Sequence, residues 1–362
     1  MDCYQTLKDL MLLPAMSGHE QRVAWYMRDY FKKLGFNPEI DVFGNVMCEV
    51  KGKNPELPVL MIFSHMDSVG LVVKKIDEQG YIRIERLGGV PEKVLSGLGV
   101  QIETKDGQMI DGYVCVKQKH VTRPEELNKV EPSKELYIDI GATCKKEVED
   151  LGIEVGSMVV YKPTCIKLLN NRVYGTYTDN RRGCAMVLGI AEELAKNQPE
   201  QTVWLVGSVQ EEFSLQGAQM AAKHIHPKMA ISIDGGIAAD APKLSELGDT
   251  KVGGGPIMYT YNFHGRGTLN GILVHPKMAR WMEEAGQRCG VNIQKLAMIG
   301  ALTDLSYVQY VDEGVACVDM GIPARNGHSP VESICIDDMY DLIKLICEFI
   351  NGVKEPLDLR RW

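Results

Sequence analysis

The sequence predicts an α/β fold interrupted by a β-rich insertion, and three observations lead to this prediction. Apolar strand-like runs alternate with helical patterns near both ends of the chain, as in α/β sheets. Between them, short β-like runs follow one another with frequent glycine turns, and helical patterns are scarce. The alternating pattern resumes at about Cys165. We therefore expect a discontinuous α/β domain (residues 1–69 and 165–362) and an inserted β-rich domain (residues 70–164).

The composition is that of a globular protein and argues against several classes of partner. The chain has 362 residues, of which 45% are hydrophobic and 24% charged. No apolar run approaches the roughly 20 residues that cross a bilayer, so we expect no membrane partner. A net charge of −8 without a basic stripe argues against nucleic acid. The N-terminus lacks a basic region followed by an apolar one, so a cytoplasmic location is expected.

The ten cysteines are scattered along the chain and form no CxxC pair. A zinc–thiolate site or a disulfide framework would require closer spacing. Several cysteines stand inside apolar runs, where a free thiol behaves as a small buried hydrophobe. We therefore expect free cysteines in a reducing compartment.

The N-terminal segment predicts a helix that begins near Ser17 and ends before Gly35. Ser17 and Glu20 have the spacing of a capping box, in which the two side chains satisfy backbone N–H groups reciprocally. Apolar residues then follow at helical spacing, namely Val23, Met27, Tyr30, Phe31 and Leu34. Further along, Pro58–Phe63 is continuously apolar, which is typical of a parallel strand covered by helices on both faces.

The insertion is predicted to form a small barrel or sandwich. Asp106-Gly107 and Asp111-Gly112 are turn signals between strand-like runs, and a short helix is expected near residues 145–151. The strand-like runs include Tyr81–Ile84, Val100–Glu103 and Tyr113–Val116. After the insertion, helices are expected over 182–196, 215–224 and 339–350, and strands over 202–209, 229–233 and 315–320.

Acids and histidines stand where the predicted strands end. They are His65 and Asp67 after the run ending at residue 63, Glu211 and Glu212 after the strand over 202–209, Asp234 after the strand over 229–233, and His328 a short loop beyond residue 320. In addition, Asp179 stands just before a predicted helix. Because ligands bind at the carboxyl ends of strands in open α/β sheets, these side chains are expected to converge at one edge.

Taken singly, each of these residues has a structural explanation. Asp179 could cap its helix, His65 could be a core histidine, and Asp234 could be a turn acid. The adjacent glutamates could end a solvated strand, and His328 could lie in a surface loop. Together, the residues favour a hydrolytic metal site. Asp304 either lines this site or caps a helix, and the remaining histidines are expected to be structural or exposed: His19, His120, His224, His226, His264 and His275.

The sequence resembles the M42 family of metallo-aminopeptidases, which includes glutamyl, deblocking and tetrahedral-assembly aminopeptidases. The resemblance covers essentially the whole chain and is carried by Ser17–Glu20, Ser64–Gly70, Thr178–Arg181, Gln210–Glu212, the Asp234 strand and His328–Glu332. It implies an aminopeptidase that hydrolyses N-terminal residues from short peptides and assembles into homo-oligomers, from dimers to dodecamers. The implied fold is a phosphorylase/hydrolase-like three-layer sandwich with a mixed sheet and an inserted barrel or PDZ-like domain for oligomerisation or substrate access.

The resemblance also implies two divalent metal ions per subunit. One would be held by His65, Asp179 and Asp234, and the other by Asp179, Glu212 and His328, so that Asp179 bridges them. Two such ions can share one carboxylate and one water, whose pKa they lower. Imidazole and carboxylate ligands suit Zn²⁺ first, with Co²⁺ or Mn²⁺ as alternatives.

Two further roles follow from the same resemblance. Asp67 would orient the ring of His65, and Glu211 would be the general base that takes the proton of the bridging water. Adjacent residues face opposite ways on a regular strand. Glu211 and Glu212 can therefore serve one site only if the strand has ended before them.

The chain departs from the family pattern at two places that leave the implied ligands intact. Residues 299–303 precede Asp304 where a Gly-Gly-Thr-Asp run is usual, and residues 324–327 precede His328 where an Arg-Tyr pair is commoner. Both changes are expected to reshape the substrate pocket. Three alternatives stay open, namely a two-metal amidohydrolase acting on N-acyl amino acids, a glucanase, and a non-catalytic scaffold.

Overall fold

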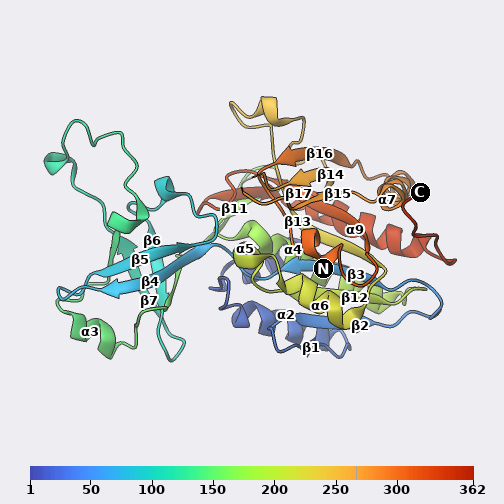
Figure 1. Ribbon diagram of the computed structural model, residues 1–362, viewed down its shortest axis with the longest axis horizontal. Helices are drawn as coiled ribbons and strands as arrows, with labels where there is room; N and C mark the ends of the chain where they lie inside the picture. The colour runs from blue at the N-terminus through green and yellow to red at the C-terminus, as the bar shows by residue number, and fades with distance from the viewer. Residues whose placement is uncertain (266) are drawn as a thin grey trace.

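The computed structural model describes residues 1–265 and 267–362 and shows a mixed α/β fold beside a closed antiparallel barrel (Figure 1). In sheet order, the strands of the large sheet are β1 (Glu39–Ile40), β2 (Val46–Val50), β12 (Val203–Ser208), β3 (Leu60–His65), β13 (Met229–Ile237), β17 (Ala316–Ala324), β14 (Ile257–Phe263) and β15 (Gly271–Leu273), and β16 (Gln294–Ile299) pairs with β14. The central strands β12, β3, β13 and β17 are parallel, whereas β2 and β14 are antiparallel to their central neighbours.

The large sheet is buried on both faces. In β3, Leu60 and Ile62 belong to one hydrophobic cluster, whereas Met61 and Phe63 belong to another. This alternation follows from the two-residue period of a β-strand, in which successive side chains point to opposite faces. Every residue of β3 is buried, so the prediction of a buried parallel strand is confirmed.

Helices that pack against the sheet contribute further side chains to each hydrophobic cluster. The first cluster receives side chains from α1 (Cys3–Met11), α2 (Gln21–Lys33), α4 (Thr178–Lys196), α7 (Pro276–Cys289) and α9 (Ile336–Gly352). The second receives side chains from α6 (Gly217–Ile225) and α8 (Leu305–Val308). The helices predicted over 182–196, 215–224 and 339–350 are confirmed as the main parts of α4, α6 and α9.

The barrel lies at the opposite end of the molecule from α7 and α9 (Figure 1). Its closed strand order is β4 (Gly70–Ile76), β5 (Ile82–Leu87), β8 (Tyr137–Asp139), β7 (Met109–Val114), β6 (Gly99–Glu103) and β9 (Met158–Tyr161). The barrel has its own hydrophobic cluster, separate from the clusters of the large sheet. Between its strands lie α3 (Lys145–Asp150), η1 (Glu92–Val94), η2 (Lys119–Val121) and η3 (Ser133–Glu135).

The two predicted turn signals of the barrel have different outcomes. Asp106-Gly107 lies in the turn between β6 and β7, as predicted. The prediction for Asp111-Gly112 is wrong, because both residues lie inside β7. A Cβ on Gly112 would lie 2.9 Å from a side-chain carbon of Ile140 and 3.0 Å from one of Ile138. The glycine is therefore there for close packing inside the strand, and it does not form a turn.

The N-terminal helix also differs from its prediction. α2 begins at Gln21, and the prediction of a capping box is wrong, because no side-chain hydrogen bond caps this helix. Ser17 Oγ donates a hydrogen bond to Asp67 Oδ2 at 2.5 Å. Glu20 Oε1 accepts from the backbone N–H groups of Gly18 and Gln210, at 2.8 and 3.1 Å. Both side chains therefore bond to distant segments of the chain, and they join the N-terminal loop to the edge of the sheet.

Several elements were not predicted. Between residues 235 and 314 the structure adds β14, β15, β16, η4 (Ser245–Leu247), α7 and α8. These strands lie at one side of the sheet, where β15 is short and β16 buries only Leu296, so neither gives a continuous apolar run. A small antiparallel sheet of β10 (Cys165–Lys167), β11 (Arg172–Gly175) and β18 (Glu332–Cys335), and the short helix α5 (Glu211–Ser214), complete the elements.

Three other predictions have plain outcomes. All ten cysteines lie in the described residues and are free thiols, as predicted. None of the described helices is both long and apolar enough to span a membrane. The domain boundaries at residues 69/70 and 164/165, the three-layer and PDZ-like designations and the cytoplasmic location stay predictions.

Phe63 provides a test of how the sheet is stabilised. Its side chain is 1% exposed and packs in the second cluster, so Phe63→Ala should lower the free energy of unfolding by about 3–5 kcal/mol. Urea denaturation measures this change. Phe43→Ala is the control, because Phe43 is 38% exposed. A decrease in the free energy of unfolding for Phe63→Ala no larger than that for Phe43→Ala would contradict the burial of Phe63 in the second cluster.

Candidate metal centre

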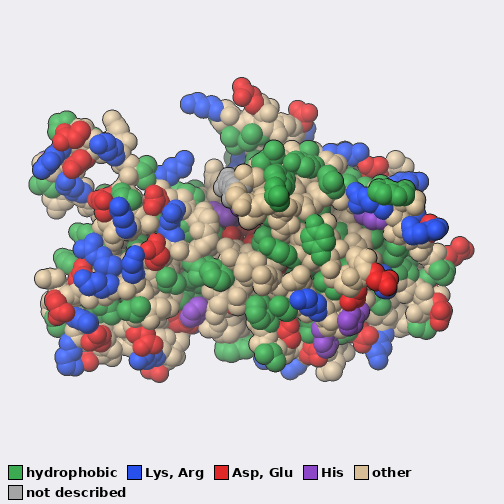
Figure 2. Space-filling model, in the orientation of Figure 1, with side chains coloured by type: hydrophobic (Ala, Val, Ile, Leu, Met, Phe, Trp, Pro, Cys, Tyr) green, Lys and Arg blue, Asp and Glu red, His purple; other side chains and the backbone are tan. Residues whose placement is uncertain are grey.

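A cavity of about 630 Å³ opens at the carboxyl ends of the parallel strands. The predicted residues His65, Asp179, Glu211, Glu212, Asp234 and His328 all line it. They come from β3, α4, α5, β13 and the loop after β17, which are far apart in the sequence. In the space-filling view, acidic and histidine side chains show in the recess between the barrel and the sheet (Figure 2). The structure therefore brings together the residues that the strand ends predicted.

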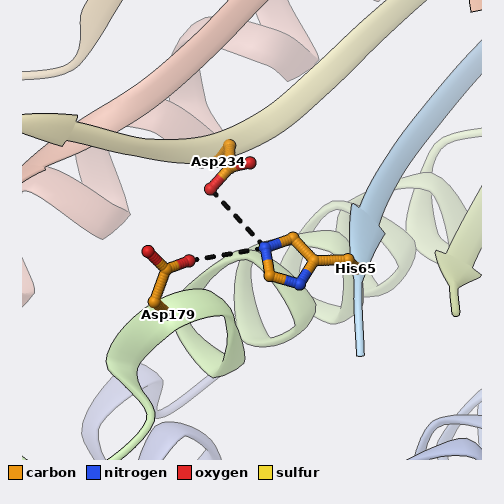
Figure 3. A group of neighbouring side chains, drawn as sticks. All are labelled: His65, Asp179 and Asp234. Carbon is orange, nitrogen blue, oxygen red and sulfur yellow. Dashed lines mark ion pairs between the residues drawn. The ribbon is translucent and has the colours of Figure 1, made fainter. Parts of the chain in front are cut away.

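The first group of neighbouring side chains is His65, Asp179 and Asp234. His65 Nε2 lies 3.4 Å from Asp179 Oδ1 and 3.7 Å from Asp234 Oδ1. Figure 3 shows the two carboxylates pointing at the same ring nitrogen from different elements. One ligand atom from each residue can be chosen so that all lie within 4.8 Å of one another, which is close enough to hold a metal ion.

The second group consists of Asp179, Glu212 and His328, and it shares Asp179 with the first. His328 Nε2 lies 3.3 Å from Glu212 Oε1 and 4.0 Å from Asp179 Oδ2. One oxygen of Asp179 thus faces each group. Asp179 is not used as a helix cap, because the capping hydrogen bond in the first turn of α4 is donated by Gly183 N to Asn180 Oδ1, at 3.0 Å.

The donor atoms fit divalent cations. Each group combines imidazole nitrogen with carboxylate oxygen, which are the ligands that zinc and similar metals take in proteins. Asp179 Oδ1 is buried without a hydrogen-bond partner among the described residues. His65 Nε2 and the Arg182 guanidinium lie 3.4 and 3.3 Å from this oxygen without forming a hydrogen bond to it, so it is open to a cation on the side of the first group.

The pKa values of Glu212 and His328 reflect the negative charge that is concentrated in the second group. Burial raises the pKa of Glu212 to about 8, and the nearby carboxylate of Asp179 adds to the rise. Burial alone would lower the pKa of His328, but Glu212 and Asp179 outweigh it and raise that pKa to about 9. Metal ligands must be deprotonated. A cation that binds the second group at neutral pH therefore displaces protons from it.

Asp67 lies directly behind His65 and is fully buried. Its Oδ1 is 3.4 Å from His65 Nδ1, and its backbone carbonyl is 3.2 Å from the same nitrogen. The carboxylate accepts the backbone N–H groups of Glu211 and Glu212, each at 3.0 Å. Burial raises the pKa of Asp67, but the bonds from His65 and Ser17 outweigh it, so the pKa is lowered. Asp67 is thus held as a carboxylate.

The two glutamates lie where the strand has ended. β12 stops at Ser208, and Glu211 begins the short helix α5, so the two side chains need not point to opposite faces of the sheet. Glu211 lies outside both ligand groups. Its pKa is raised well above the usual range, because it is buried and near Glu212 and Asp234. A carboxylate with a raised proton affinity beside a ligand group is suited to accept a proton.

Two buried charged residues were missed as parts of the site. Arg182 is 1% exposed, and its guanidinium lies 3.3 Å from Asp179 Oδ1. Glu332 accepts from Asp179 N at 2.8 Å and from His328 N at 2.6 Å. A signal for Arg182 was available. The following residues 183–191 are apolar all round, which predicts a buried helix, and a charge at its start must then be paired.

Asp304, His264 and the two segments that depart from the family pattern also lie at or near the cavity. Asp304 is buried and accepts from Ser208 Oγ at 2.7 Å, and its side chain makes no cap to α8. Burial raises its pKa to about 7. His264, which was expected to be structural or exposed, lines the cavity. The two departing segments contribute Gly300, Ala301, Leu302, Thr303, Ala324 and Gly327 to the lining, as expected of residues that shape the pocket.

Comparisons with known proteins agree with this geometry. The family model described as M42 glutamyl aminopeptidase matches residues 44–345. The Escherichia coli (strain K12) protein SgcX is 34% identical over 343 residues, which cover 94% of this chain and 91% of that protein. The structure of aminopeptidase APDkam598 from the archaeon Desulfurococcus kamchatkensis superposes with a TM-score of 0.90 at 33% identity, covering 97% and 95% of the two chains.

A further solved structure connects the fold to a large assembly. Pyrococcus horikoshii TET1 peptidase, which is described as assembling into a tetrahedron or a large octahedral shell, matches with a TM-score of 0.85. The identity is 27%, and the match covers 97% of this chain and 100% of that one. Because the family model spans most of the sequence and a relative exceeds 30% identity over nearly all of it, the chain belongs to the M42 family of aminopeptidases and is a hydrolase that acts on peptide bonds.

Proposed function

We propose that the protein is a binuclear metal-dependent aminopeptidase that removes N-terminal residues from short peptides. The observation that carries this proposal is the position of Asp179. Its Oδ1 lies 3.4 Å from His65 in one ligand group, and its Oδ2 lies 4.0 Å from His328 in the other. A carboxylate placed in this way can bridge two ions. Zn²⁺ is the first candidate, with Co²⁺ or Mn²⁺ as alternatives.

The ligands proposed are His65, Asp179 and Asp234 for one ion, and Asp179, Glu212 and His328 for the other. When bound, two such ions supply a water of lowered pKa and polarise the scissile carbonyl. Arg182 supports the shared ligand, because its buried guanidinium offsets part of the charge at Asp179 Oδ1. Together with His65, Arg182 outweighs burial and lowers the pKa of Asp179, so this carboxylate is ready to bind a cation.

Glu211 is the proposed general base. Its carboxylate takes a proton from the attacking water and returns it to the leaving amine, which both steps of peptide hydrolysis require. Asp67 fixes this residue at its backbone N–H, at 3.0 Å, and also contacts the ring of His65. One buried carboxylate thus sets the relative positions of the base and of a metal ligand.

The assembly proposed is a homo-oligomer, from a dimer to a dodecamer. The support is the overall similarity to Pyrococcus horikoshii TET1 peptidase, which is described as forming a tetrahedron or an octahedral shell. The barrel, residues 70–164, is the proposed contributor to oligomerisation and to substrate access. An enclosed assembly would admit short or unfolded peptides.

The shared ligand gives a test by metal content. Wild-type protein should retain two ions per chain after dialysis, as measured by plasma mass spectrometry, and Asp234→Asn should lose one. Asp179→Asn should lose both, because it weakens both groups. Asp106→Asn, in an exposed turn, is the control. Two ions retained by the Asp179 variant would exclude it as the bridge.

The general base gives a test by turnover. Glu211→Gln should lower kcat by about 10²–10⁴-fold, because an amide cannot take the proton of the water. Its metal content should stay at the wild-type value, since Glu211 lies outside both groups. Glu313→Gln at an exposed position serves as the control. Unchanged kcat in the Glu211 variant would show that another residue is the base.

A substrate panel decides between the peptide and the acyl alternatives. Aminoacyl-p-nitroanilides with different N-terminal residues should be hydrolysed, and N-acyl amino acids should not. Hydrolysis should stop on removal of metal by a chelator and return when Zn²⁺ or Co²⁺ is added. Activity on N-acyl amino acids alone would overturn the aminopeptidase proposal.

A further inference from the structure

The backbone of His328 has an unusual conformation for a residue in a ligand group. Its φ is +62°, in the left-handed region that residues other than glycine rarely adopt. This conformation allows its ring to face Glu212 and Asp179, with Nε2 3.3 Å from Glu212 Oε1. A strained residue at a functional site persists only when its surroundings hold it there.

Three hydrogen bonds hold His328, and two of them come from the barrel. The backbone N–H donates to Glu332 Oε1 at 2.6 Å. The hydroxyl of Tyr161, at the end of β9, donates to the backbone carbonyl of His328 at 3.2 Å. The ring Nδ1 lies 3.1 Å from the backbone carbonyl oxygen of Gly89, in the turn after β5. The barrel therefore contacts both the backbone and the ring of this ligand.

The Gly89 contact fixes the tautomer of the ring. A backbone carbonyl can only accept a hydrogen bond, so Nδ1 must carry the proton and donate it. When the ring is neutral, as a metal ligand must be, Nε2 has the lone pair, and it faces Glu212 and Asp179. Metal-binding histidines are commonly set in this way by a hydrogen bond at the other ring nitrogen.

The turn after β5 also fits closely around the second group. A Cβ on Gly89 would lie 2.8 Å from Nδ1 of His328, and one on Gly88 would lie 3.2 Å from the backbone oxygen of Glu212. Gly89 does not have a positive φ, so only the approach of the ring requires glycine there. The turn therefore packs against two of the three residues of the second group.

We propose that Gly89 and Tyr161 are positioning residues for His328. The contacts of the barrel with His328 and the binding of a metal ion by the second group then stabilise each other. This inference rests on the proposed function. The first group differs, because His65 is oriented by Asp67 from the end of its own strand. Loss of the barrel contacts should therefore weaken the second group and spare the first.

The test is a calorimetric titration of metal-free protein with Zn²⁺. Gly89→Ala places a methyl group against the ring and should weaken one of the two zinc sites by about 10–100-fold, the range seen when the partner of a ligating histidine is lost. The other site should keep its wild-type affinity. Gly99→Ala, elsewhere on the barrel, is the control, because its Cβ would meet no atom closer than 3.8 Å.

A second variant removes a hydrogen bond without adding volume. Tyr161→Phe deletes the hydroxyl and keeps the ring, which stacks on Tyr177 at a centroid distance of 5.6 Å. It should weaken the same site in the same direction. Tyr113→Phe is its control, since that hydroxyl bonds Asp139 on the barrel surface. Circular dichroism checks that each variant is folded. If Gly89→Ala does not fold, the zinc affinities of Tyr161→Phe alone test the proposal.

The outcomes separate this inference from the proposed function. Wild-type protein that binds fewer than two Zn²⁺ ions overturns the binuclear proposal, and this inference with it. Two wild-type sites, together with unchanged affinities in both variants, overturn the positioning role of the barrel and leave the proposed function standing. Equal weakening of both sites would also overturn it, because the barrel contacts reach only the second group.

Discussion

The buried carboxylate of Asp67 connects the segments that carry the candidate metal site. It accepts the hydroxyl of Ser17 from the N-terminal loop and the backbone N–H groups of Glu211 and Glu212 from the start of α5. It also lies behind the ring of His65. Because a buried carboxylate must be satisfied by donors, the loop, the strand end and the short helix cannot move independently.

Around Asp67, the carboxylates of the described residues outnumber the positively charged side chains that could balance them. Arg182 is within 3.3 Å of Asp179, but burial still raises the pKa of Glu211, Glu212 and Asp304. Apolar strands below the site hold these groups away from water, which makes their mutual repulsion stronger. Divalent cations bound at the candidate site would relieve that repulsion, so burial of these carboxylates would favour metal binding.

The barrel enters the site by an indirect route. It contributes none of the proposed ligands, yet its residues Gly89 and Tyr161 contact His328. The β-rich insertion between β3 and α4 therefore contacts a proposed ligand without supplying one itself. This arrangement gives the insertion a role within one subunit, besides any role between subunits.

The class of fold and the residue types of the site could be predicted from local sequence patterns. Apolar runs that end in His65, Glu211 or Asp234 are local patterns, and the carboxyl ends of parallel strands bring such ends together in any α/β sheet. The shared role of Asp179 came from family resemblance, and its two-sided position became visible only in the structure. Ser17 and Glu20 have the local spacing of a capping box, but their hydrogen-bond partners depend on how distant segments pack.

The contact between Gly89 and His328 could not be predicted from local sequence patterns either, because the two residues are 239 positions apart in the chain. Local spacing carries information about helices, strands and turns, since those depend on neighbours in sequence. It carries none about which buried donor meets which acceptor, because that depends on how distant elements pack.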